Sequence, residues 1–315
     1  MFLVCGEALW DLFATDGADG LTLDARIGGS PFNVAVGLAR LDRKVALLTG
    51  MSRDPMGQRL TAALIDEQVG TKYLVETSQP STLSLVDVGP DGTPAYTFYG
   101  HDAADRTLRV EDLPVLGPDV WGIHAGSYSL VVEPVGSSLL SLVEREAGRR
   151  LITLDPNVRL TVEPDTALWR GRIDRFATHA DLIKVSDEDL GLIFPGATAA
   201  EIAGRWLDAG AGLVVVTRGE SGAEAFLPNS HYSVAGHQIE LVDTVGAGDT
   251  FQAAMIAGLS ELGIWSRQTL DRMAPERLCT LIGFATRAAS VTCSRRGADL
   301  PYRTELPDLP TGAFA

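Results

Sequence analysis

The second half of the chain alternates short, continuously apolar segments with helical ones in a regular order. The apolar segments are residues 122–126, 151–154, 182–185 and 213–216. A strand that is apolar at every position is covered on both faces, and its alternation with helices is typical of a parallel sheet between two helical layers. The sequence therefore predicts an α/β fold with a doubly wound, mostly parallel sheet and helices on both faces.

Polar clusters follow three of these predicted strands directly. They are residues 155–159, 186–189 and 217–222. In sheets of this kind, ligands bind beyond the carboxyl ends of the strands. We therefore expect a binding site along this edge of the sheet.

One stretch, Asp243–Phe251, combines a glycine turn with a helix start. The apolar residues Ile239, Leu241 and Val242 predict a strand before it, and apolar residues at helical spacing after it predict a long helix. The third glycine of a dinucleotide fingerprint would fall at Phe251, and no P-loop sequence occurs. Both of those nucleotide-binding motifs are therefore excluded.

The turn itself contains only small residues, Gly246, Ala247 and Gly248, which leave the backbone N–H groups uncovered. N–H groups at a helix start bind anions, because they lack partners within the helix and lie at the positive end of its dipole. Asp249 would repel an anion there, so it fits better as the acceptor of a proton from a hydroxyl group. Taken alone, it could also be a helix cap worth ~1 kcal/mol.

Composition narrows the classes of partner. The chain has 315 residues and a formal charge of −15, which argues against nucleic acid as a partner because phosphate neutralisation needs clustered Lys and Arg. No apolar run is long enough to span a membrane. Cys5, Cys279 and Cys293 are far apart and odd in number, so we expect reduced thiols and a cytoplasmic protein.

The N-terminal part predicts a buried strand over Phe2–Leu9 and, further on, a helix that opens at Gly28 and Gly29 with Pro31 in its first turn. The paired glycines let a ligand approach the backbone closely. Asn33 offers both a donor and an acceptor to a hydroxyl group. A simple glycine turn with a helix cap accounts for this motif equally well.

A small second sheet is predicted from an interruption of the α/β pattern. Residues 82–88 and 95–99 alternate in polarity around a turn at 89–92, which indicates a β-hairpin. We expect residues 12–26 and 72–108 to form this sheet together, with the α/β core made of residues 1–11, 27–71 and 109–315.

With Gly28–Asn33 near the start and Asp243–Asp249 near the end, the chain resembles the ribokinase-like (PfkB-type) carbohydrate kinases over nearly its whole length. The resemblance implies a ribokinase-like fold with a β-sheet lid over the sugar. Four further stretches resemble the bacterial fructokinase branch: Gly6–Asp11, Asp155–Arg159, Lys184–Asp189 and Thr292–Ala298.

This resemblance implies an ATP-dependent fructokinase that phosphorylates the 6-hydroxyl of D-fructose. Other acceptors stay open, namely 2-keto-3-deoxygluconate, ribose, another ketose or a nucleoside, as does a non-catalytic sugar-binding protein on the same fold. Asp249 would be the base, Gly246, Ala247 and Gly248 the anion hole, and Arg159 a cation that offsets charge in the transition state.

The remaining site residues are also carried over from the resemblance. The sugar would be contacted by Asp11, Gly28, Gly29, Asn33 and Phe98. Asn157 would lie toward the phosphates. The ATP site would be bordered by Lys184, Ser186, Thr217, Gly219, Gly222 and Thr286. Mg²⁺ would be oriented through water by Glu188 and Asp189, and Asp243 would lie near a monovalent cation site for K⁺.

Two departures from the family pattern are visible. The usual Asn-x-x-Glu motif is Ser186-x-x-Asp189 here, and Gly100 stands where relatives often carry a basic residue after the lid aromatics. The resemblance also implies a homodimer that forms through the lid.

Overall fold

The computed structural model describes residues 1–17, 20–88 and 94–309. Its larger sheet contains strands β1 (Phe2–Cys5), β4 (Val45–Ser52), β5 (Leu74–Thr77), β8 (Gly122–Gly126), β9 (Leu151–Asp155), β10 (Leu182–Ser186), β11 (Leu213–Thr217), β12 (Ala223–Leu227) and β13 (Ser230–Val234). They are ordered β13-β12-β11-β10-β9-β8-β1-β4-β5, and all neighbours pair in parallel except β11–β12 and β12–β13. The predicted mostly parallel sheet is confirmed.

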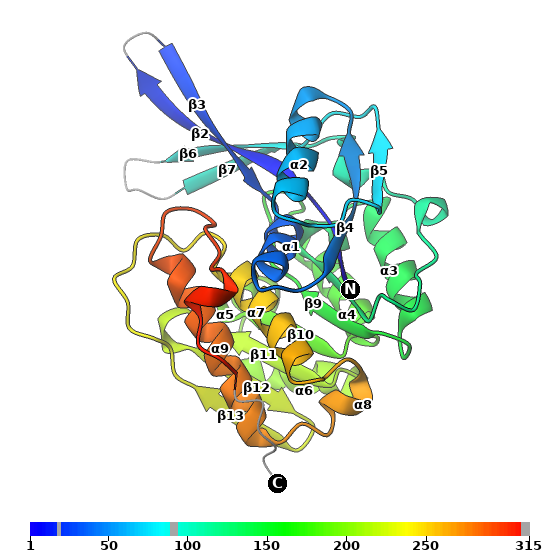
Figure 1. The fold of residues 1–315 in the computed structure, drawn as a ribbon, viewed down its shortest axis with the longest axis vertical. Coiled ribbons are helices and arrows are strands. Elements are labelled where there is room, and N and C mark those ends of the chain that lie inside the picture. Colours follow the sequence, from blue (N-terminus) through cyan, green and yellow to red (C-terminus); the bar gives the residue numbers. More distant parts are fainter. Residues whose placement is uncertain (18–19, 89–93, 310–315) are drawn as a thin grey trace.

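Helices cover both faces of this sheet (Figure 1). They are α1 (Ser30–Arg40), α2 (Pro55–Asp66), α3 (Val135–Glu146), α4 (Thr166–Ala177), α5 (Asp187–Ile193), α6 (Ala199–Ala209), α7 (Ala247–Glu261), α8 (Arg267–Leu270) and α9 (Pro275–Cys293). Successive residues of β1 point into two separate cores. Phe2 and Val4 pack in the core of α1, α7 and α9, whereas Leu3 and Cys5 pack in the core of α3, α4 and α6.

A four-stranded sheet projects from this body (Figure 1). It contains β2 (Leu9–Gly17), β3 (Gly20–Gly28), β6 (Leu83–Val88) and β7 (Pro94–Tyr99), in the order β3-β2-β6-β7. The predicted hairpin turn at residues 89–92 lies outside the described residues. Strand β3 leads through Gly29 directly into α1, so the small sheet joins the core without a connecting loop.

Two predicted strands are wrong in extent. The first strand ends at Cys5 rather than Leu9, because Gly6, with φ +139°, leaves the extended conformation. The close ring of Pro31, 2.5 Å from the place of a Cβ, favours glycine at this position. The segment 235–244 contains no strand. Its last residues follow the end of α9 instead, where the N–H groups of Val242 and Asp243 donate to the carbonyl of Cys293.

In the described part of the chain, none of the helices has the length and apolar character needed to cross a bilayer.

Candidate active site

Asp249 lies in the first turn of α7, and its side chain is clamped by the start of α1. It is 7% exposed. The hydroxyl of Ser30 donates to Oδ1 at 2.7 Å, and the amide of Asn33 donates to Oδ2 at 2.8 Å. The two motifs at opposite ends of the sequence therefore form one site, with the carboxylate held in a defined orientation.

The glycine turn before Asp249 keeps part of its backbone open. Gly246 has φ +77°, and a Cβ there would lie 2.7 Å from that of Ala298. The N–H of Ala247 donates to the carbonyl of Thr244 at 3.2 Å. Among the described residues, the N–H groups of Gly246 and Gly248 have no partner. Two of the three expected anion-binding amides are thus free, and the third closes the turn.

The turn is held in place by the last turn of α9 and by the loop that follows it. The hydroxyl of Thr250 donates to the carbonyl of Gly246 at 2.9 Å and lies 2.8 Å from the hydroxyl of Thr292. The carboxylate of Asp243 accepts from the N–H of Val245 at 3.0 Å and from that of Gly297 at 2.8 Å. These contacts position the amides.

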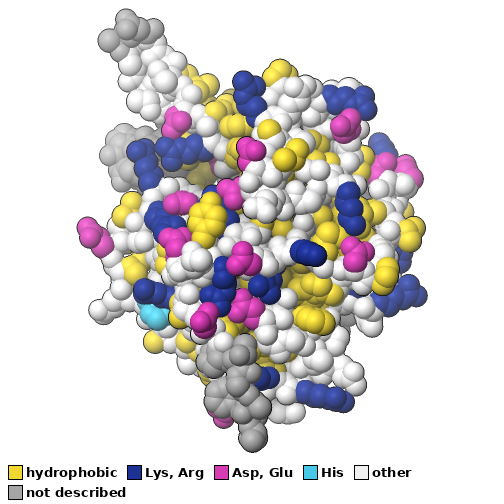
Figure 2. Space-filling view, viewed as in Figure 1, with side chains coloured by type: hydrophobic (Ala, Val, Ile, Leu, Met, Phe, Trp, Pro, Cys, Tyr) yellow, Lys and Arg dark blue, Asp and Glu magenta, His cyan; other side chains and the backbone are white. Residues whose placement is uncertain are grey.

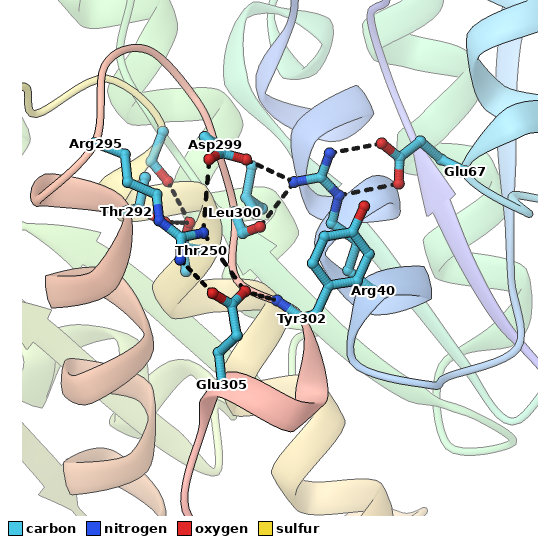
Figure 3. A network of polar contacts seen from close by, with 10 residues as sticks. Arg40, Glu67, Thr250, Thr292, Arg295, Asp299, Leu300, Tyr302 and Glu305 are labelled. Atoms are coloured by element: carbon cyan, nitrogen blue, oxygen red, sulfur yellow. Dashed lines mark hydrogen bonds and ion pairs between the residues drawn. The ribbon is translucent and has the colours of Figure 1, made fainter.

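An ion-pair network ties the same loop to α1 and α2 (Figure 3). Arg40 pairs with Glu67 at 2.6 Å and with Asp299 at 3.0 Å. Arg295 pairs with Asp299 at 3.6 Å and with Glu305. The helix that carries Ser30 and Asn33 is thereby fixed relative to the loop that supports the turn.

A buried ion pair lies directly beneath the turn. Lys184 is 3% exposed, and its Nζ lies 2.8 Å from Oδ2 of Asp155 and 2.8 Å from the place of a Cβ on Gly248. Burial raises the pKa of Asp155 to about 6, against the opposing effect of the lysine charge. Burial also acts to lower the pKa of Lys184, but Asp155 outweighs it and the pKa is raised. A positive charge is therefore kept beside the open amides.

The small sheet contributes one face to the site. Asp11, Ser84 and Phe98 are direct cross-strand neighbours on β2, β6 and β7. Burial raises the pKa of Asp11 to about 6, while the Ser84 hydroxyl and the Arg159 charge oppose that rise. A Cβ on Gly28 would lie 2.2 Å from Oδ2 of Asp11, so only glycine leaves room for this carboxylate.

The segment after β9 lies between the core and this sheet. Asn157 is half-buried with φ +38°, and Arg159 is exposed. The guanidinium of Arg159 donates to the carbonyl of Val158 at 3.0 Å, and its charge acts on both Asp11 and Tyr96. Arg159 is thus close enough to influence Asp11 electrostatically, and it forms no ion pair within 4.0 Å among the described residues.

The residues expected to border ATP lie at the carboxyl ends of β10 and β11 and on α9. Ser186 caps α5, its hydroxyl accepting from the N–H of Asp189 at 3.0 Å. Thr217 ends β11 and is followed by Gly219 at φ +51° and Gly222 at φ +99°. Thr286 lies buried on α9, which packs against α7 and β13.

The expected metal ligands do not converge. Within the described ranges, no three side chains of His, Cys, Asp or Glu are grouped to hold a metal ion. Glu188 is exposed. Asp189 is buried and accepts from the N–H of Val158 at 3.0 Å. The carboxylates of the described residues therefore form no cage of three or more ligands.

Two side chains close to the proposed chemistry were not assigned from the sequence. Ser30 lies within the Gly28–Asn33 motif but holds Asp249, which is 219 residues away. Asp155 is the last residue of β9, and its carboxylate accepts from the ammonium of Lys184. The sequence could have marked both residues as candidates, because Ser30 stands between the glycines and Asn33, and Asp155 directly follows the apolar run at 151–154. It could not show that they contact Asp249 and Lys184.

Comparisons with known proteins agree with this geometry. The model of the pfkB family of carbohydrate kinases matches residues 2–305. The fructokinase of Rhizobium leguminosarum bv. trifolii is 38% identical over 262 residues, which cover 82% of this chain and 79% of that protein.

Solved structures show the same fold. The fructokinase of Xylella fastidiosa with bound ATP has a TM-score of 0.86 at 25% identity and covers 98% of this chain and 96% of its own. A double mutant of the fructokinase of Vibrio cholerae O395, in a form with bound fructose, ADP and potassium ion, has a TM-score of 0.80 at 27% identity and covers 94% and 93%. The chain described here belongs to the pfkB family of carbohydrate kinases.

Proposed function

We propose that this protein is an ATP-dependent fructokinase that transfers the γ-phosphoryl group of ATP to the 6-hydroxyl of D-fructose. The observation that carries the proposal is the carboxylate of Asp249, held by Ser30 and Asn33 beside the open amides of Gly246 and Gly248. A proton acceptor next to an anion site is what phosphoryl transfer to an alcohol requires. Relatives named fructokinase, and neighbours solved with ATP, ADP or fructose, support the two substrates.

In this proposal Asp249 takes the proton from the attacking hydroxyl as the oxygen attacks the γ-phosphorus in line. The N–H groups of Gly246 and Gly248, at the positive end of α7, hold the charge of the transferred group, and the N–H of Ala247 joins them when it leaves Thr244. The ammonium of Lys184 and the guanidinium of Arg159 offset further negative charge. Catalysis then rests on positioning and electrostatics.

The sugar is proposed to lie between the core and the small sheet. Asp11, Asn33 and Phe98 contact it from two sides, Gly28 and Gly29 admit it close to the backbone, and Asn157 lies toward the phosphates. The expected lid of residues 12–26 and 72–108 is narrowed to the sheet of β2, β3, β6 and β7, because β5 (Leu74–Thr77) pairs with β4 in the larger sheet. This small sheet is proposed to close over the sugar. Closure excludes water, which would otherwise compete with the sugar as the acceptor.

ATP is proposed to lie along Ser186, Thr217, Gly219, Gly222 and Thr286. Mg²⁺ usually binds one or two carboxylates, substrate phosphates and water, and the single carboxylates found here fit that mode. Glu188 would hold the hydrated ion, and Asp189 would orient the segment around it. Bound Mg²⁺ would supply positive charge that offsets the negative charge of the phosphates. Asp243, whose oxygens still have lone pairs free, would border a K⁺ site.

We also propose a cytoplasmic homodimer that forms through the small sheet. Leu21, on the edge strand β3, is 61% exposed, and Leu23 on the same strand and Tyr99 on the opposite edge are exposed as well. Exposed apolar side chains on unpaired edges favour association with a second sheet. The cytoplasmic location is supported by three free cysteines.

The test is a coupled assay of ADP release with a panel of sugars. We expect fructose to be turned over with a higher kcat/KM than 2-keto-3-deoxygluconate, ribose, other ketoses or nucleosides. Asp249→Asn should lower kcat by roughly 10²- to 10⁴-fold while calorimetry still detects ATP binding. Asp208→Asn, an exposed aspartate of α6, is the control and should leave kcat unchanged.

The sugar panel and the Asp249→Asn variant test the acceptor and the base independently. Preference for another sugar would replace the acceptor and keep the chemistry. Near-native turnover by Asp249→Asn would remove the base.

A further inference from the structure

A guanidinium at the base of the small sheet lacks hydrogen bonds. Arg106 lies in the segment between β7 and the core, and its Nε and Nη2 atoms are buried without a partner among the described residues. Buried polar atoms in folded proteins almost always have a partner, so an exception requires a physical reason. A ligand oxygen would provide one.

The acid next to it in sequence does not satisfy it. The carboxylate of Asp105 accepts from the hydroxyl of Thr82 at 2.5 Å and from that of Tyr128 at 2.8 Å. Both its oxygens are therefore engaged by hydroxyl groups. No ion pair of Arg106 within 4.0 Å is found in residues 1–17, 20–88 and 94–309. The guanidinium and its nearest acid thus do not form a salt bridge.

Aromatic rings connect Arg106 to the sugar side of the sheet. Its Cζ lies 5.0 Å from the centroid of the Tyr128 ring. The Tyr128 ring meets the Phe98 ring edge-on, with centroids 6.0 Å apart. Phe98 is the cross-strand neighbour of Ser84, and Ser84 that of Asp11. The guanidinium therefore adjoins the aromatic end of the face that carries Asp11.

Arg106 also fills the space that Gly100 leaves. Gly100 follows Phe98 by two residues, and a Cβ on it would lie 2.5 Å from Nη2 and 2.8 Å from Cζ of Arg106. Gly100 is not among the glycines with positive φ, so its backbone admits a side chain. The three atoms nearest to such a Cβ all belong to this guanidinium. The Arg106 guanidinium thus occupies the space in which a side chain at position 100 would lie.

We propose that Arg106 is a sugar-binding residue that determines specificity, and that its buried N–H groups donate to an oxygen of the bound sugar. This inference rests on the proposed function. The planar fork of an arginine holds an oxygen in a defined direction, which a lysine cannot do in the same way. A sugar that lacks the recognised oxygen would leave the guanidinium unpaired and would bind weakly.

The first test is Arg106→Met, which keeps an apolar stem over Tyr128 and removes all the donors. We expect KM for fructose to rise about tenfold to a hundredfold, as for the loss of a hydrogen bond to a charged group, while KM for ATP stays within about twofold. Arg109→Met, which alters an exposed arginine three residues along the chain, should change neither value. If Arg106→Met is poorly folded by thermal unfolding, Arg106→Lys is measured instead and should raise the fructose KM selectively.

The second test identifies the oxygen with 1-, 3- and 4-deoxyfructose. The wild-type protein should bind one of them worst, and Arg106→Met should show no further loss with that analogue. Gly100→Arg in the Arg106→Met background should recover fructose KM. A folded Arg106→Met variant with unchanged fructose KM, or one with equal losses for every analogue, would overturn the assignment.

A failure of the proposed function is seen separately, because it would appear as absent turnover of fructose by the wild-type protein. If another sugar is turned over, the same comparisons are made with the deoxy forms of that sugar.

Discussion

Glu7 carries a carboxyl group into the interior just after β1. It is 1% exposed, and the hydroxyl of Ser129 donates to it at 2.5 Å. Burial raises the pKa of Glu7 to about 7, against the effect of the neighbouring hydroxyls of Ser127 and Ser129. The folded protein therefore keeps a proton on Glu7 at pH values at which the unfolded chain has lost it.

This proton makes stability depend on pH. Between about pH 4.5 and 7 the folded state binds more protons at Glu7 than the unfolded state, so the free energy of unfolding falls as pH rises, by about 3 kcal/mol from this group. Urea unfolding at pH 5 and pH 8 should show a smaller fall for Glu7→Gln than for the wild-type protein. Glu111→Gln, an exposed change, should keep the full fall. Identical falls in all three proteins would contradict the burial of a protonated Glu7.

At the scale of single residues, the local sequence identified candidate functional groups but not the residues that they contact. Asp249 and its glycine turn were recognisable because small residues and a carboxylate stand together at a helix start. The contact between Ser30 and Asp249 joins residues 219 positions apart, and Arg106 fills a space at Gly100 only because the chain turns back between them. Contacts of this kind follow from packing, which single-residue patterns do not encode.

Among the elements, α7 depends most on the backbone at its start. Gly246 has φ +77° and Gly263, just beyond the other end of α7, has φ +73°, so alanine is strained at both by about 1–3 kcal/mol. A Cβ at Gly263 meets nothing within 4 Å, whereas one at Gly246 would lie 2.7 Å from the Cβ of Ala298. Alanine at either glycine therefore introduces similar backbone strain, but only alanine at Gly246 also introduces a steric clash.

We expect Gly246→Ala to lower both melting temperature and kcat, because the open amides are displaced with the turn. Gly263→Ala should lower the melting temperature alone. Differential scanning fluorimetry and the coupled assay measure the two effects. Equal kcat values in the two variants would show that the geometry of the turn does not limit catalysis.

The central strands were predictable because a short, continuously apolar run that is bounded by polar clusters is typical of a strand buried on both faces. Ile239, Leu241 and Val242 have the same apolar character, yet they are exposed and belong to no strand. The preceding strand β13 already forms the edge of the sheet, and the N–H groups of Val242 and Asp243 are used by the end of α9. Periodicity alone does not show that a strand lacks a place in the sheet.

At the scale of the whole molecule, the distribution of charged and exposed apolar side chains bears on which partners the protein binds. Acidic and basic side chains are interspersed on the face shown in Figure 2. The apolar residues Leu21 and Leu23 on β3 instead favour contact with a second protein sheet.

Light scattering after size-exclusion chromatography should therefore give a dimer, about twice the chain mass of 33.5 kDa. The double variant Leu21→Glu, Leu23→Glu places like charges on the edge strand and should elute as a monomer. Ile65→Glu, at an exposed position of α2, should stay dimeric. A monomeric wild-type protein, or a double variant that remains dimeric, would exclude this interface.

The direct connection from β3 into α1 links the small sheet to the residues that hold Asp249. Gly28 and Gly29 form one of the connections between the small sheet and the core, and Ser30 and Asn33 follow them in the first turn of α1. Those two side chains hold the carboxylate of Asp249. If the small sheet and Asp249 act as proposed, the six residues from Gly28 to Asn33 would connect movement of that sheet to the orientation of the proton acceptor.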